Sequence, residues 1–151
     1  MELKQLTEIG VAVRDLEKTT RVLVEAFQGQ AGAVYDVPLF GMRFRMVRIG
    51  NIDIELMEPT SEKGIIAKFL DARGEGMHHV AFAVENLEAR VEEMKNAGYV
   101  LVNEKPLEIF DAKVTFLHPK SFSGLAVELV EYPSDWKGWF TDDMMKEGGA
   151  L

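Results

Sequence analysis

The sequence predicts an α+β fold in which two tandem βαβββ modules form a curled mixed sheet around a shared cleft. The prediction depends on two internal matches. Residues 8–17, EIGVAVRDLE, align with residues 79–88, HVAFAVENLE, which lie 71 positions later. Residues 54–59, IELMEP, align with residues 127–133, VELVEYP, and 73 positions separate their aligned glutamates. Because both matches keep the same order and nearly the same offset, they indicate an internal duplication.

The first module is expected at about residues 5–60. Alternating valine and isoleucine predict a strand at 6–13. Asp15 then caps a predicted helix from Leu16 to Phe27, which Gly29 and Gly32 end. Three short strands complete the module, at about residues 33–37, 41–48 and 51–58.

The second module is expected at about residues 77–133 and repeats this order. Asn86 caps its helix, which ends at Gly98. The strands of this module are predicted at about 78–84, 100–103, 112–118 and 125–131. A linker helix at about 62–71, capped by Ser61, joins the modules. Residues 1–135 therefore form one domain, and residues 136–151 form a C-terminal tail that is a candidate dimer element.

Composition narrows the class of protein. Hydrophobic residues make up 47% of the chain, which is enough for a packed core, yet no apolar run reaches the about 20 residues that cross a bilayer. The net charge of −8 and the lack of basic clusters argue against a nucleic-acid partner. The absence of cysteine excludes disulfides and thiolate metal sites. We expect a cytoplasmic protein that binds a small molecule.

The duplication also predicts a metal site. Glu8 and His79 occupy equivalent positions in the two modules, and so do Glu55 and Glu128. If a pseudo-twofold axis relates the modules, these four side chains meet near it. Carboxylate and imidazole are suitable ligands for a divalent metal ion. A single charged residue in a strand usually lies on a solvated face, which is the reading for Asp53, Glu58 and Glu131, but the duplicated pairs favour a metal site.

The sequence resembles the vicinal oxygen chelate superfamily, which includes the glyoxalases, and most closely its methylmalonyl-CoA epimerase family. The resemblance covers about residues 6–133. Three segments carry it: Ile52–Pro59 (IDIELMEP), Ala67–Phe82 (AKFLDARGEGMHHVAF) and His118–Ser121 (HPKS), the last followed by Gly124–Leu129.

The resemblance implies a metal-dependent isomerase that epimerises an acyl-CoA thioester through a metal-stabilised enolate. It implies a divalent ion (Mg, Mn, Co, Ni or Zn), a homodimer, Glu128 as one acid/base group, and Lys120 as a contact for a carboxylate or phosphate of the substrate. The chain departs from the family at Glu8, where the family usually has a histidine ligand. A carboxylate there favours harder ions such as Mg²⁺, Mn²⁺ or Ca²⁺.

A second departure concerns the other acid/base group. Some family members place a carboxylate in the strand at 41–48, but this chain has none there. We therefore expect Glu8 to act as the second acid/base group. Two alternatives stay open: a glyoxalase I-type isomerase or lyase on the same scaffold, and a non-catalytic protein that binds a small molecule.

Overall fold

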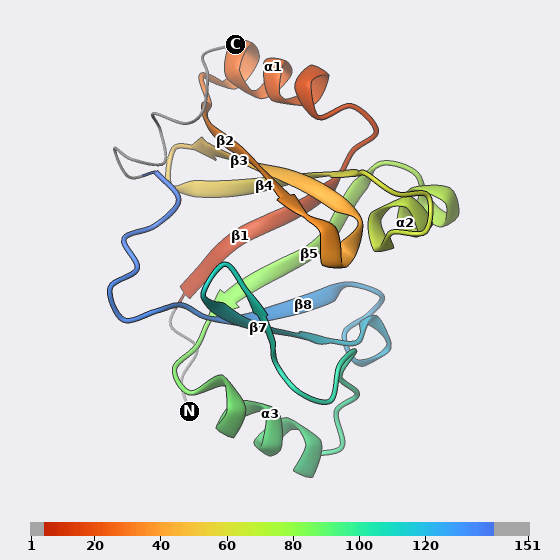
Figure 1. Ribbon diagram of the computed structural model, residues 1–151, viewed down its shortest axis with the longest axis vertical. Helices are drawn as coiled ribbons and strands as arrows, with labels where there is room; N and C mark the ends of the chain where they lie inside the picture. The colour runs from red at the N-terminus through yellow and green to blue at the C-terminus, as the bar shows by residue number, and fades with distance from the viewer. Residues whose placement is uncertain (1–4, 141–151) are drawn as a thin grey trace. The chain divides into compact units, whose positions relative to one another are not determined.

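The computed structural model describes residues 5–140, and its elements follow the predicted order (Figure 1). The first module contains β1 (Gln5–Ala12), α1 (Leu16–Phe27), β2 (Gln30–Val37), β3 (Met42–Ile49) and β4 (Ile52–Pro59). The linker helix is α2 (Ile65–Arg73). The second module contains β5 (Gly76–Ala83), α3 (Leu87–Asn96), β6 (Leu107–Ile109), β7 (Ala112–Leu117) and β8 (Ala126–Glu131). The α+β class with two βαβββ modules is confirmed.

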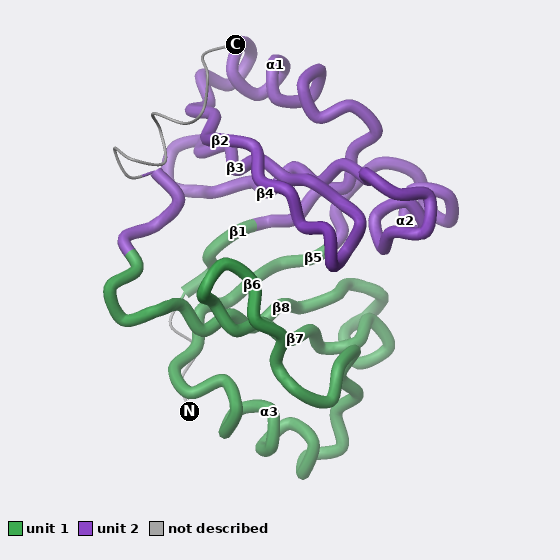
Figure 2. Tube along the Cα trace, viewed as in Figure 1, with its two compact units in different colours: residues 1–8, 79–136 green, residues 9–78, 137–151 purple. Residues whose placement is uncertain are grey.

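The chain divides into two compact units whose boundaries lie inside β1 and β5 (Figure 2). The first unit is described over residues 5–8 and 79–136, and the second over 9–78 and 137–140. Glu8 therefore belongs to the same unit as His79 and Glu128, whereas Glu55 belongs to the second unit.

Strand pairing is the same in both modules. In the first, β1 pairs with β4 in parallel, and β4, β3 and β2 pair antiparallel in that order. In the second, β5 pairs with β8 in parallel, and β8, β7 and β6 pair antiparallel in that order. Gly10 lies opposite Glu55, and Ala81 lies opposite Glu128. The register thus repeats at the positions that the sequence comparison aligned.

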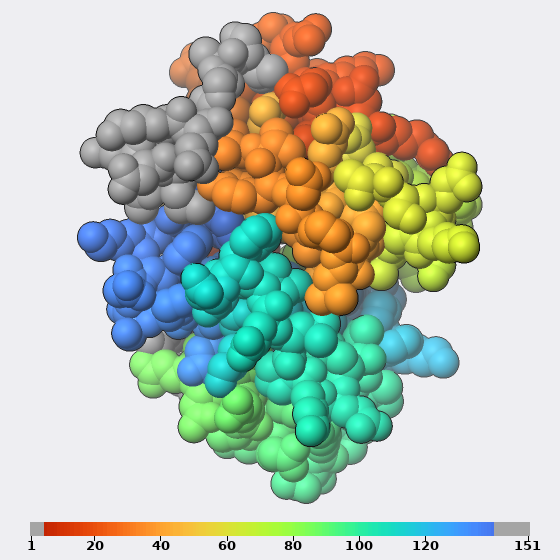
Figure 3. Space-filling view, in the orientation of Figure 1, coloured from red at the N-terminus to blue at the C-terminus, as the bar shows by residue number. Residues whose placement is uncertain are grey.

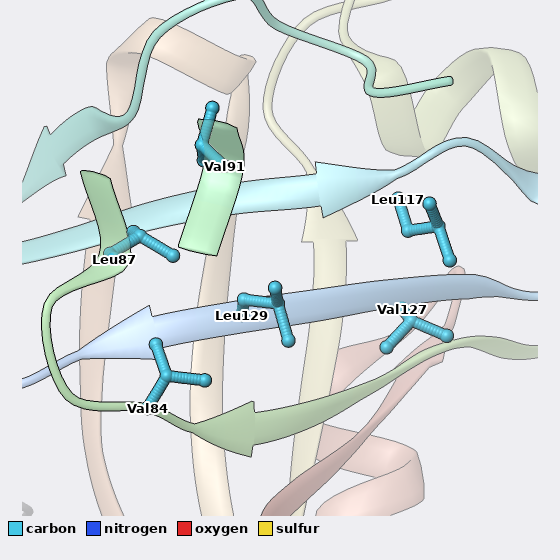
Figure 4. Packing of buried hydrophobic residues seen from close by; sticks show 6 residues of the cluster. All are labelled: Val84, Leu87, Val91, Leu117, Val127 and Leu129. Carbon is cyan, nitrogen blue, oxygen red and sulfur yellow. The ribbon is translucent and has the colours of Figure 1, made fainter. Parts of the chain in front are cut away.

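Each module packs its helix against one face of its own strands. Asp15 caps α1 by accepting a hydrogen bond from the N–H of Lys18, and Asn86 caps α3 by accepting one from the N–H of Ala89. Beneath α1 lies a buried cluster of Val13, Leu16, Val47 and Leu56. Beneath α3 lies the equivalent cluster, made of Val84, Leu87, Val91, Leu117, Val127 and Leu129 (Figure 4). Apolar burial on this face leaves the opposite face of each set of strands for other contacts.

Glu58 and Glu131 are a second duplicated pair of carboxylates, and they have a structural role. Glu58 accepts a hydrogen bond of 3.1 Å from the N–H of Leu16, and Glu131 accepts one of 2.8 Å from the N–H of Leu87. Each leucine is the first residue of its helix, where N–H groups lack partners within the helix and negative charge is favourable. The sequence-based assignment of Glu58 and Glu131 to a solvated face was therefore wrong.

Two predicted elements are also corrected. Gly64, not Ser61, is the N-cap of α2, and it provides no side chain as a cap. The hydroxyl of Ser61 instead accepts a hydrogen bond from the N–H of Lys63.

The predicted strand at 100–103 is a single bridge between Leu101 and Leu117. The strand that pairs with the other end of β7 is β6, which turns back through Phe110 and Asp111, both with positive φ. Two successive positive φ values are typical of a tight hairpin turn, but glycine or asparagine usually marks it in a sequence. Two lysines connect this region to α3. The ammonium of Lys95, on α3, donates to the backbone carbonyl of Glu104. The ammonium of Lys113, on β7, donates to the carboxylate of Glu88 on α3. Figure 3 shows this region in teal against the green surface of α3.

Within the described residues, no helix combines the length and the apolar character needed to cross a membrane.

The duplicated helix contacts predict a measurable loss of stability. We expect Glu131→Ala to lower the free energy of unfolding by about 1–2 kcal/mol, because it removes a charged acceptor from the first N–H of α3. Glu25→Ala, at an exposed position of α1, is the matched control and should change stability by less than about 0.5 kcal/mol. Urea unfolding measures both. Equal effects of the two substitutions would contradict the structural role of Glu131.

Candidate functional site

His79 and Glu128 form the centre of the candidate site in the first unit. His79 lies opposite Ala126, and Glu128 lies opposite Ala81. Because cross-strand partners share a face and side chains alternate along a strand, His79 and Glu128 project from the same side. Nε2 of His79 lies 3.0 Å from Oε2 of Glu128, and both side chains are buried. Leu129 projects from the other side, into the cluster beneath α3 (Figure 4).

Glu8 adds a second buried carboxylate. Its exposed fraction is 5%. The hydroxyl of Tyr132 donates a hydrogen bond of 3.3 Å to Oε2 of Glu8. Burial, and after it the charge of Glu128, raises the pKa of Glu8 to about 7, although the nearby His79 opposes the shift. Burial also raises the pKa of Glu128 to about 8. Glu128 is therefore close enough to Glu8 to disfavour the ionisation of Glu8.

The surroundings of these groups are apolar. The ring of Phe116 meets His79 edge to face, with 5.8 Å between the ring centroids. Phe116 also packs against a buried cluster of Ala112, Val114 and Val130. Such an environment excludes water and strengthens every charge interaction inside it. Two buried carboxyl groups in this environment must either hold protons or, when ionised, be balanced by a cation.

The donor set in this unit fits a divalent ion. Glu8, His79 and Glu128 offer carboxylate oxygen and imidazole nitrogen, the ligands that Mg²⁺, Mn²⁺ and Zn²⁺ take from proteins. Nε2 of His79 and Oε2 of Glu128 lie 3.0 Å apart, so one ion could be held by both. Among the described residues, no three His, Cys, Asp or Glu side chains are already gathered as a complete set of ligands.

Glu55 lies in the second unit. It is 9% exposed and pairs across the strands with Met46, while Phe44 pairs with Met57. These four side chains share one face of β3 and β4 because alternate residues point the same way. The participation of Glu55 in a four-ligand site with Glu8, His79 and Glu128 stays a prediction.

The described part of the C-terminal tail packs within the chain. The ring of Trp139 contacts the rings of Phe44 and Tyr35, at centroid distances of 5.5 and 5.8 Å. Phe140 lies under the guanidinium of Arg48, 4.3 Å from its ring centroid. Since Phe44 and Arg48 project from the same face as Glu55, Trp139 and Phe140 cover that face of the second unit. Residues 141–151 lie outside the described residues, and the tail as a dimer element stays a prediction.

The other candidate residues have varied surroundings. Lys120 is exposed in the short turn Pro119–Ser121, where its N–H donates to Nδ1 of His118. Its role as an anion contact stays a prediction. His78 meets the ring of Phe69 on α2 at a centroid distance of 4.9 Å, so it packs beneath that helix. Asp53, expected on a solvated face, instead forms a bidentate ion pair with Arg48, with both contacts at 2.7 Å.

A family model described as the Glyoxalase/Bleomycin resistance protein/Dioxygenase superfamily matches residues 7–116. This chain belongs to that superfamily. The match spans most of both modules, so the duplicated βαβββ architecture is that of the superfamily.

Relatives within the superfamily carry epimerase names. The chain is 34% identical to the mitochondrial methylmalonyl-CoA epimerase of Mus musculus, over 85% of this chain and 73% of that protein. It is 33% identical to the ethylmalonyl-CoA/methylmalonyl-CoA epimerase of Cereibacter sphaeroides, over 83% of this chain and 96% of that protein. A variant of the Streptomyces coelicolor methylmalonyl-CoA epimerase has been solved in complex with 2-nitronate-propionyl-CoA. That structure matches with a TM-score of 0.82 and 27% identity, over 88% of this chain and 97% of that chain.

Tyr132 is the site residue that sequence reasoning missed. Tyr132 comes directly after the last predicted strand and before Pro133, where the repeat ends. The signal was nevertheless present. Glu128, residue 130 and Tyr132 alternate along the chain, so extending the strand pattern by one residue would have placed Tyr132 on the face of Glu128.

The buried carboxyl pair predicts an unusual pH dependence of the stability of the metal-free protein. A carboxyl group whose pKa is raised by folding stabilises the fold below its unfolded value of 4.5 and loses that contribution as pH rises through its folded value. Between pH 5 and about pH 8, stability in EDTA should therefore fall. Glu8→Gln should flatten this fall, because it removes one titrating group and its repulsion with Glu128. Thermal unfolding measured across this pH range checks the prediction, and identical slopes for both proteins would refute it.

Metal binding should stabilise the protein most at a pH at which the carboxylates are ionised. At pH 8, Mn²⁺ is expected to raise the melting temperature of the native protein more than that of Glu8→Gln, because the variant has lost a charged oxygen donor. Glu108→Gln, at an exposed position, is the matched control and should respond like the native protein. A stabilisation by Mn²⁺ that is equal in all three proteins would place the ion elsewhere.

Proposed function

We propose that the protein epimerises a methylmalonyl-CoA-like thioester by moving a proton on and off the carbon between its thioester and carboxylate groups. The observation that carries the proposal is the pair of buried carboxyl groups, Glu8 and Glu128, with pKa values raised to about 7 and about 8. Proton transfer is most efficient when the acid or base has a pKa near the working pH. The similarity to proteins named methylmalonyl-CoA epimerases supports the same reaction.

Epimerisation needs proton exchange on both faces of the α-carbon, which is why two carboxyl groups are required. In one direction, the ionised Glu128 accepts the α-proton, and the electron pair of the broken C–H bond moves toward the thioester oxygen. The protonated Glu8 then gives its proton to the opposite face of the carbon. Exchange with water resets both groups, and the reverse direction exchanges their roles. Between its two titration steps the pair holds one proton, which is the charge state that this cycle needs.

The apolar surroundings and the imidazole favour the same chemistry. Phe116 and the cluster beside it exclude water, so charge that develops on the substrate is weakly screened. Nε2 of His79 lies 3.0 Å from Oε2 of Glu128, so the imidazole is next to the carboxylate that accepts the α-proton. A divalent ion bound by Glu8, His79 and Glu128 would add positive charge beside the substrate oxygens and lower the energy of the enolate.

The ligand in the Streptomyces coelicolor structure supports an enolate-forming reaction for this chain. A nitronate next to the propionyl-CoA carbonyl is planar and anionic, as an enolate is, and a ligand of that shape suits a site built for the transition state. Lys120 is the candidate contact for a carboxylate or phosphate of the acyl-CoA. The proposal also includes metal dependence, a homodimer and a cytoplasmic location.

Exchange of the α-hydrogen tests the function directly. In D₂O, the metal-loaded protein should incorporate deuterium into methylmalonyl-CoA and interconvert its epimers, as measured by mass spectrometry and chiral analysis. Glu128→Gln should lower both rates by about 10²–10⁴-fold, because it removes a general acid/base group. Glu108→Gln, an exposed carboxylate of the same unit, should leave them unchanged.

A protein that does not exchange the α-hydrogen would have a different function. If the native protein left the α-hydrogen of methylmalonyl-CoA in place, the epimerase proposal would be wrong. Conversion of a hemithioacetal would then support the glyoxalase I-type alternative, and binding without turnover would support the non-catalytic one.

A further inference from the structure

We infer that Tyr132, backed by Trp136, is a positioning residue that holds Glu8 for proton transfer on one face of the substrate. The inference rests on the proposed function for the reaction itself. The contacts behind it all lie within the first unit, and Tyr132 and Trp136 belong to the segment that follows β8.

The ring of Tyr132 is fixed by packing. On one side it contacts the apolar cluster that contains Ala112, Val114 and Val130. The indole of Trp136 also stacks on it, with 4.9 Å between ring centroids and an interplanar angle of 5°. The N–H of Trp136 donates a hydrogen bond of 3.0 Å to the carbonyl of Pro133, which closes a turn and sets Trp136 over Tyr132. The phenol therefore reaches Glu8 from a rigid support.

Glu8 needs such support because a glutamate side chain has several rotatable bonds, so the backbone alone does not orient its carboxyl group. The hydroxyl of Tyr132 donates to Oε2 of Glu8, which restrains the carboxyl group. A phenol provides this hydrogen bond without adding a positive charge to the site.

Orientation matters for the rate because a displacement of about 1 Å at a reacting group can cost about 10²-fold. Tyr132 contacts Glu8, and Glu8 serves only one of the two faces of the α-carbon. Loss of the hydroxyl should therefore affect the two epimers differently. A residue that only stabilises the fold would slow the reactions of both epimers alike.

The test compares exchange with inversion for each separate epimer of methylmalonyl-CoA in D₂O. Tyr132→Phe keeps the stacked ring and removes the hydroxyl. We expect epimerisation to fall about 10–100-fold. We also expect one epimer to keep exchanging its α-hydrogen without inversion, because Glu128 still works, while exchange of the other epimer falls with epimerisation. Tyr99→Phe, an exposed tyrosine of the same unit, is the matched control and should behave as the native protein.

Variants at position 136 test the support. Trp136→Leu keeps the hydroxyl of Tyr132 but removes the stacked ring, and it should show the same asymmetry between epimers in weaker form. Trp136→Phe keeps an aromatic ring and should lose less activity than Trp136→Leu. Equal slowing of both epimers in Tyr132→Phe, or no change at all, would overturn the inference.

A double-mutant cycle separates this inference from the proposed function. The melting temperatures of the native protein, Tyr132→Phe, Glu8→Gln and the double variant should be non-additive, because each single substitution breaks the same contact. Additive shifts would overturn the contact between Tyr132 and Glu8 even in an active enzyme. If the native protein fails to exchange either epimer, the proposed function falls and the positioning role falls with it, whereas non-additive shifts would still establish the contact.

Discussion

Two carboxyl groups buried beside one imidazole impose the main constraint on this protein. In water Glu8 and Glu128 would ionise independently, but burial makes each charge costly and their proximity makes a second charge costlier. The folded chain can satisfy the pair with shared protons or with a cation. With shared protons, the two groups exchange protons near neutral pH, and this property links the packing of the first unit to acid/base chemistry. A cation would instead favour their ionised forms.

The duplicated architecture explains how the pair arises. Each module buries an apolar face beneath its helix and keeps the opposite face of its strands for other side chains. Equivalent positions have then diverged in some places and not in others. Glu58 and Glu131 both accept a hydrogen bond from the first N–H of a helix, whereas Glu8 and His79 differ in chemistry. Glu55 and Glu128, which are equivalent positions on the faces away from the helices, are also both glutamate, so Glu8 and His79 are the duplicated pair whose chemistry differs.

The sequence was sufficient for much of this account. The repeat predicted both βαβββ modules, and the cap residues Asp15 and Asn86 predicted where α1 and α3 begin. The duplicated positions predicted that Glu128 and His79 lie together, and the structure places them 3.0 Å apart. Three features escaped because they depend on tertiary contacts that no local pattern marks. Phe110 and Asp111 turn β6 back without a glycine, Glu58 and Glu131 reach helix ends far along the chain, and Tyr132 contacts a residue 124 positions away.

The direct test of the central claim is a carbon-13 NMR titration of the glutamate side-chain carboxyl groups in the metal-free protein. The account predicts two coupled carboxyl resonances that titrate between about pH 6 and pH 9, that collapse to a simpler curve in Glu8→Gln, and that move to lower pH when Mg²⁺ or Zn²⁺ binds. If every glutamate titrated near its ordinary value of 4.5, Glu8 and Glu128 would be solvated, independent groups, and the proposed chemistry would lose its physical basis.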